Sequence, residues 1–125
     1  MWVIDTIYYK DVDVKACLLS NIIIFHENNQ CELPYSESRC LNELGLINEV
    51  GGKWILKEED SGAFLLHFKT GNRLFNGVQR VWFYKGDDKG LLKMELYSDS
   101  LYMICSKWLY DYRKDIKNLG KVLDS

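Results

Sequence analysis

The sequence has a single proline, Pro34, among its 125 residues. It therefore lacks the proline-rich stretches that form stiff linkers or extended tails. It also lacks any apolar run near the roughly 20 residues of a membrane-spanning helix, so we expect no membrane span. The length suffices for one domain and is too short for two ordinary ones. We predict a single domain over residues 1–125.

Charge of one sign is not concentrated anywhere in the chain. The 16 basic and 18 acidic residues are interspersed and leave a formal net charge of -2. A nucleic-acid-binding surface needs clustered Lys and Arg, so we expect no nucleic-acid partner. The start, Met1 to Ile4, lacks the pattern of a signal peptide. We expect a cytoplasmic location for the chain as given, and a periplasmic or surface-anchored one if it is a trimmed mature form.

Closely spaced metal ligands are missing as well. None of the four cysteines forms a Cys-x-x-Cys pair, and both histidines lie far from them in the sequence. A zinc site normally shows at least one such pair, so we expect no metal and no cofactor. The cysteines are interpreted as small buried hydrophobic residues. A disulfide between Cys31 and Cys40 remains an alternative for an exported protein.

Aromatic residues, by contrast, are abundant, at 14% of the chain. They bury large areas and favour strands over helices. Segments rich in aromatic and β-branched residues recur between short turns of Gly, Asn, Asp and Ser. We predict eight strands, at residues 2–10, 21–26, 30–33, 53–58, 63–68, 77–84, 91–97 and 101–105.

Short strands joined by tight turns predict an antiparallel meander, because parallel strands need long crossovers. Closing the meander removes both exposed edges, so we predict an all-β, eight-stranded up-and-down barrel. A two-sheet sandwich or a half-open barrel is the alternative. We also expect helical pieces: a short helix at residues 14–20 after the first strand, about two turns within Ser36–Gly45, and a C-terminal helix at Asp111–Leu123.

Alternation along the strands predicts which side chains face inward. Leu92, Met94 and Leu96 form the apolar side of one strand, opposite the more polar Lys93, Glu95 and Tyr97. The strand at residues 77–84 carries aromatic residues on both faces. Either the tail helix and the irregular segment after Pro34 cover the outer aromatic residues, or a partner does.

The chain resembles small bacterial lipocalin-like, or calycin-type, barrel proteins. The resemblance rests on Trp2–Tyr9, Gly51–Leu56, Leu74–Gly77, Val81–Tyr84 and Leu91–Lys107. The Gly-x-Trp motif stands mid-chain here, at Gly52 to Trp54. The resemblance implies a barrel with an interior site for a small apolar molecule. It also implies a basic residue packed on Trp2, for which Arg113 is the candidate.

Polar residues within apolar strands are the candidates for a ligand site. Arg80 and His67 stand out, and an inward-facing polar group of this kind needs a partner. One interpretation pairs Arg80 with Glu95 on the neighbouring strand. The other makes Arg80 the anchor for a ligand head group in an apolar pocket. The candidate ligand-binding residues are Arg80, Phe83, Met94, Leu96 and His67.

No catalytic motif with distinctive spacing is present, so we predict that the protein is not an enzyme. Cys105 with His67, or Glu95 with Arg80, would be the pairs to test for chemistry. The first functional hypothesis is a non-enzymatic protein that binds a small hydrophobic molecule inside the barrel. The alternative is a protein-interaction module, of an inhibitor or immunity type, that uses an exterior aromatic surface. The identity of the ligand or partner and the oligomeric state stay open.

Overall fold

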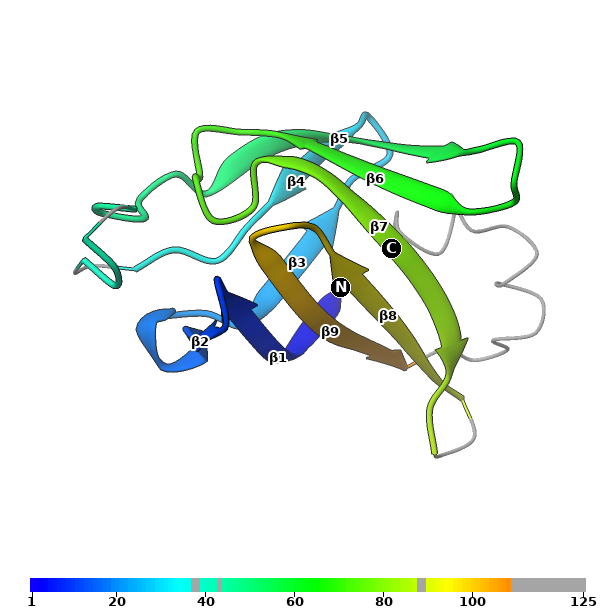
Figure 1. Ribbon diagram of the computed structural model, residues 1–125, viewed down its shortest axis with the longest axis horizontal. Helices are drawn as coiled ribbons and strands as arrows, with labels where there is room; N and C mark the ends of the chain where they lie inside the picture. The colour runs from blue at the N-terminus through cyan, green and yellow to red at the C-terminus, as the bar shows by residue number, and fades with distance from the viewer. Residues whose placement is uncertain (37–38, 43, 88–89, 109–125) are drawn as a thin grey trace.

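The computed structural model describes residues 1–36, 39–42, 44–87 and 90–108 (Figure 1). Nine strands and one short 3₁₀ helix lie within these residues. In chain order they are β1 (Trp2–Tyr9), β2 (Val12–Asp13), η1 (Lys15–Cys17), β3 (Ile22–Phe25), β4 (Gln30–Glu32), β5 (Gly51–Glu58), β6 (Phe64–Lys69), β7 (Gly77–Lys85), β8 (Leu91–Tyr97) and β9 (Leu101–Trp108).

The strands form one antiparallel sheet that closes on itself. Their order is β2-β1-β3-β4-β5-β6-β7-β8-β9, and β1 also pairs with β9. Eight strands, β1 and β3 to β9, therefore make the wall, while the two-residue β2 pairs only with the end of β1. In Figure 1, β7 passes from the upper strands β5 and β6 down to β8 and β9. The predicted eight-stranded antiparallel barrel is confirmed.

The seam between β1 and β9 closes the barrel. Their register pairs Ile7 with Met103 and Tyr8 with Tyr102, and it shifts between Ile4 and Thr6. Such a shift is a β-bulge, which bends a strand and increases its twist. The bulge therefore lies where the first strand must curve to meet the last.

Inward-facing side chains from around the wall line the interior. Trp54, Phe25, Phe68 and Phe75 form a continuous series of ring contacts, with centroids 5.3 to 6.2 Å apart. Leu92, Met94 and Leu96 are all fully buried, as the alternation along β8 predicts. The side chains that β8 contributes to the apolar core thus follow the β-strand period of two.

The connection between β4 and β5 is tied to the barrel by Asn72. Its side-chain amide donates to the carbonyl oxygens of Pro34 and Glu49, at 2.8 and 3.0 Å, and the residue is buried. Three hydrogen-bonding groups of one amide are satisfied, because its oxygen also accepts the backbone N–H of Leu74. The connection is therefore part of the packed structure.

The predicted helical pieces are smaller than expected. Only η1 forms after the first strand, and the described part of Ser36–Gly45 makes a turn closed by a β-bridge between Arg39 and Leu46. Gly45, with a φ of +68°, ends that turn, and the backbone N–H groups of Leu44 and Gly45 both donate to the carbonyl oxygen of Leu41. The predicted helix at Asp111–Leu123 lies outside the described residues.

Candidate functional site

The candidate residues chosen from the sequence fall on two sides of the barrel wall. Met94 and Leu96 are fully buried inside, and the half-buried Phe83 lies 6.2 Å from Trp2 between ring centroids. Arg80 and His67 have the opposite strand parity and are exposed on the outer surface. The structure thus brings Phe83, Met94 and Leu96 into the interior and separates Arg80 and His67 from them.

The predicted cross-strand pair of Arg80 and Glu95 is wrong. The register of β7 and β8 places Arg80 opposite Tyr97, and Glu95 opposite Trp82. Among the residues that the structure describes, no ion pair joins Arg80 to a carboxylate. The register depends on the hairpin that follows Lys85, and the strand pattern alone does not fix it.

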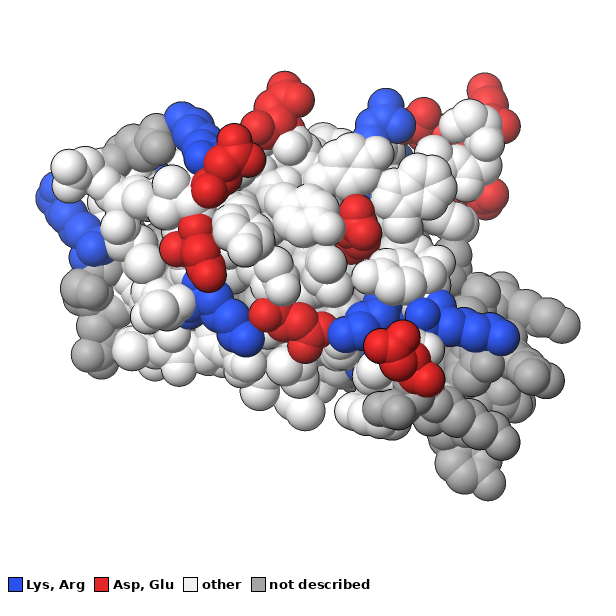
Figure 2. Space-filling view, turned by 60° about the horizontal axis from the view of Figure 1, so that its bottom comes forward, with Lys and Arg blue, Asp and Glu red and all other residues white. Residues whose placement is uncertain are grey.

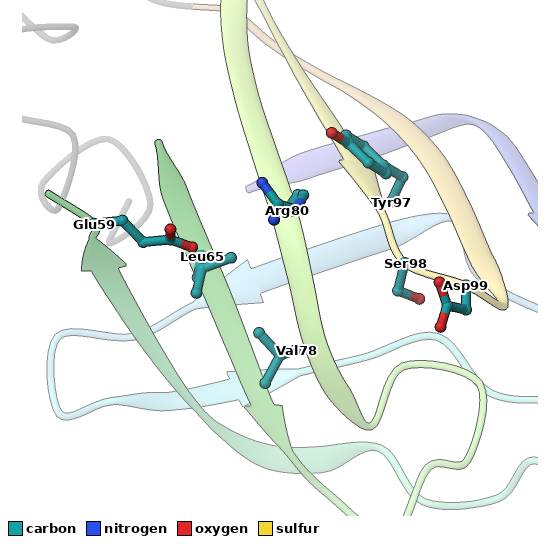
Figure 3. A pocket seen from close by; sticks show the side chains of 7 residues that line it. All are labelled: Glu59, Leu65, Val78, Arg80, Tyr97, Ser98 and Asp99. Carbon is teal, nitrogen blue, oxygen red and sulfur yellow. The ribbon is translucent and has the colours of Figure 1, made fainter. Parts of the chain in front are cut away.

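Arg80 instead lies in a shallow pocket on the outside of the barrel (Figure 3). The pocket has a volume of about 380 Å³. In Figure 3, the Arg80 guanidinium stands between Glu59 on one side and Ser98 and Asp99 on the other. The complete lining is Glu59, Leu65, Val78, Arg80, Tyr97, Ser98 and Asp99.

Exposed aromatic side chains lie beside this pocket on adjoining strands. Trp82 is 53% exposed, Tyr84 40%, and both Tyr8 and Tyr102 37%. Tyr8 and Tyr102 are register partners whose ring centroids lie 6.5 Å apart. We call the outer surface formed by Tyr8, Trp82, Tyr84, Glu95 and Tyr102 the aromatic face. Figure 2 shows uncharged side chains, several of them rings, gathered around an acidic residue on this side of the molecule.

Glu95 is the centre of the aromatic face. It is opposite Trp82 on one side and opposite Ile104 on the other. Burial, and then the negative charge of Glu95, raise the pKa of both Tyr84 and Tyr102. The carboxylate therefore lies close enough to both phenols to disfavour their ionisation.

A polar cluster of Asp5, Lys93 and Ser106 adjoins the aromatic face. The Lys93 ammonium is 2.9 Å from the Asp5 carboxylate and 2.6 Å from the Ser106 hydroxyl, which itself donates to Asp5. The geometry is that of an ion pair between Lys93 and Asp5 that the Ser106 hydroxyl bridges.

The predicted pair of Cys105 and His67 does not meet. Cys105 is fully buried in the interior, where burial strongly raises its pKa, while His67 points outward from β6. Nor do His, Cys, Asp or Glu side chains gather into a metal-binding group anywhere in the described ranges.

The disulfide considered for Cys31 and Cys40 is not formed. Cys31 is buried in the core, whereas the half-buried Cys40 donates to the Ser36 hydroxyl at 3.6 Å. The thiol neighbouring Cys40 is that of Cys17: their hydrogen bond, after burial, raises the pKa of Cys17 to about 11. All four cysteines are free thiols.

Sequence reasoning missed the basic residue that covers Trp2. The Lys107 ammonium lies 5.7 Å from the Trp2 ring centroid, within the range of a cation–π contact. Arg113, the candidate for this position, lies outside the described residues. The signal for Lys107 was available, because it lies two residues from Cys105 and so shares that residue's inward face.

No protein-family model, curated protein or solved structure matches this chain. Within the described part, no helix has the length and apolarity needed to cross a membrane.

Proposed function

We propose that the protein is a non-enzymatic interaction module that binds a partner protein through the aromatic face. The observation that carries the proposal is the exposure of Trp82 and Tyr84 on β7, Tyr102 on β9 and Tyr8 on β1, with only β8 between β7 and β9. Tyrosine and tryptophan are enriched at the centres of protein interfaces, where they contribute much of the binding free energy. Single exposed apolar residues need no explanation, but a contiguous group does.

The rigid placement of these side chains favours binding of a partner protein. They stand on hydrogen-bonded strands of a closed barrel, and each has only two side-chain torsions to fix on binding. Both properties reduce the conformational entropy lost when a partner docks. The pocket around Arg80 adjoins the face and offers a recess beside it.

The test is native mass spectrometry of the full chain isolated from its own host. We expect the wild type to retain a stoichiometric partner. Truncation of an interface hot spot costs about 2 kcal/mol, or roughly 30-fold in Kd, so Trp82→Ala should release most of that partner. Ile55→Ala is the matched control, because Ile55 is a similarly exposed apolar residue on β5. Equal retention by both variants would contradict the proposal.

A second candidate is a lipocalin-like role, in which the barrel interior holds a small ligand. It is favoured by two buried polar atoms, Trp2 Nε1 and Gln79 Oε1, that have no hydrogen-bond partner among the described residues. A buried polar group without a partner is costly, and an ordered water or a ligand relieves that cost. The same mass spectra would reveal this function as a retained small molecule, lost in Gln79→Leu or Trp2→Phe.

A further inference from the structure

The aromatic face has a carboxylate at its centre, and this charge restricts what can dock there. Trp82 and Ile104 are the direct cross-strand neighbours of Glu95, and its diagonal ones are Arg80, Tyr84, Tyr102 and Ser106. Direct neighbours on one face have Cβ atoms about 5 Å apart, and diagonal ones are within reach of aromatic side chains. Three aromatic side chains therefore lie around Glu95, together with one aliphatic side chain, one hydroxyl and the cation of Arg80.

Nearby cations of the chain do not neutralise this carboxylate. Lys93 is held by Asp5 and Ser106 through contacts of 2.9 and 2.6 Å. Arg80 is a diagonal neighbour of Glu95, opposite Tyr97, but it forms no ion pair with any described carboxylate. Within the described part of the chain, Glu95 likewise has no ion-pair partner.

Docking of a partner would remove water from a carboxylate that is already half-buried. Desolvating an ion without a counter-charge costs several kcal/mol, so an apolar partner would lose much of the free energy it gained on the rings. A partner that brings a cation avoids this loss. The aromatic rings add to the attraction, since their faces bind cations.

The charge of the surface around Glu95 also favours a cationic partner. The aromatic face, the polar cluster and the Arg80 pocket together carry four acidic residues and two basic ones, and Lys15, whose ammonium donates to the backbone oxygen of Asp5 at 3.0 Å, brings the local balance to -1. The acidic residues are Asp5, Glu59, Glu95 and Asp99, and the basic residues are Arg80 and Lys93. Positive potential on the partner would complement this surface.

We infer that Glu95, with Trp82, Tyr84 and Tyr102, is a receptor for an arginine side chain of the partner protein. The planar guanidinium can stack on an indole ring while it donates two hydrogen bonds to one carboxylate, which a lysine ammonium cannot do. This inference rests on the proposed function and specifies the chemistry of the partner.

The direct probe is a tetra-arginine peptide, with tetra-citrulline as its uncharged counterpart of nearly the same shape. Binding to the full chain is followed by NMR at the indole N–H of Trp82, assigned by its loss in Trp82→Phe. We expect the arginine peptide to shift this resonance and the citrulline peptide to leave it in place. Glu95→Gln should weaken the arginine peptide at least tenfold.

The matched control is Glu27→Gln, the same chemical change at an exposed residue of the β3–β4 turn. It should leave the affinity within about twofold of the wild type. The inference is overturned if the wild type shows no shift at millimolar peptide, if citrulline binds equally, or if Glu95→Gln has no larger effect than Glu27→Gln.

Retention of the natural partner separates this inference from the proposed function. If Trp82→Ala releases the partner and Glu95→Gln retains it fully, the aromatic face is an interface but the arginine receptor is wrong. If both release it, and Glu27→Gln does not, both conclusions are supported. If neither variant releases the partner, the proposed function fails and the receptor fails with it.

Discussion

The Lys93 ammonium lies 2.9 Å from the Asp5 carboxylate and so links β8 to β1 across the strand between them. Ser106, on that intervening strand β9, hydrogen-bonds to both groups. The two ends of the ion pair are 88 residues apart in the sequence. The contact thus fastens the seam of the barrel, next to the bulge in β1.

We expect Asp5→Asn and Lys93→Met each to destabilise the fold by about 1 kcal/mol, since both side chains are partly exposed. In a double-mutant cycle, the pair should show a coupling of about 0.5–1 kcal/mol in urea unfolding at low salt, and less at 1 M salt. Lys57→Met, on the exposed side of β5, is the control and should change stability by less than about 0.5 kcal/mol. A coupling of zero would show that the cluster does not hold the seam.

The interior ring series predicts a strong contrast between two adjacent residues. Phe68 is fully buried, with its ring 5.9 Å from Phe25 and 6.2 Å from Phe75 between centroids. Its neighbour His67 is exposed on the outside of β6. We expect Phe68→Ala to lower the free energy of unfolding by about 3–5 kcal/mol, and His67→Ala by less than about 0.5. Chemical denaturation measures both, and similar losses would mean that the inward face of β6 is misassigned.

The strands and the inward faces were predictable because they depend on local alternation. The positions of Leu92, Met94 and Leu96, for example, follow from the period of two within one strand. Closure of the barrel followed from the number of strands and their short turns. Those predictions did not depend on which residues are partners across neighbouring strands.

Relationships between strands were not predictable in the same way. Arg80 was assigned to Glu95 because both lie on adjacent strands, but the register sets Tyr97 opposite Arg80. A shift of two residues keeps every side chain on its face, so the hydrophobic pattern cannot detect it. Contacts such as that of Asp5 with Lys93 need the closed barrel before they exist at all. An exterior aromatic surface was expected, but which strands combine to form it was not predictable for the same reason.

Thiol accessibility gives a further prediction. Cys31 and Cys105 are buried in the core, whereas Cys17 and Cys40 are half-buried and adjacent to each other. We expect a thiol reagent such as iodoacetamide to reach only Cys17 and Cys40 in the folded protein, with Cys17 reacting slowly because its raised pKa leaves little thiolate, and to modify all four after unfolding. Peptide mass mapping identifies the sites. Modification of Cys105 before Cys17 would contradict the described interior.

Burial of Cys31 predicts how stability depends on alkaline pH. Burial raises the pKa of this thiol from its ordinary value of 9.0 to about 11. Between these values the unfolded chain loses the proton while the folded protein keeps it, so the folded state binds more protons and stability falls as pH rises. The stabilisation that the protonated Cys31 thiol gives to the folded state is complete below about pH 8 and is lost by about pH 11. Two pKa units correspond to at most about 3 kcal/mol.

Cys31→Ala isolates this effect, because it removes the titrating thiol and keeps a small apolar side chain. The variant should be less stable than the wild type near pH 7, since truncation leaves a small cavity in the core. The difference should narrow between pH 9 and 11, as only the wild type must keep a buried thiol protonated. Cys17, Cys105, Tyr84 and Tyr102 also have raised pKa values and are common to both proteins, so their alkaline destabilisation cancels in the comparison. A difference in urea midpoints that stays constant up to pH 11 would show that the Cys31 thiol titrates alike in the folded and unfolded states.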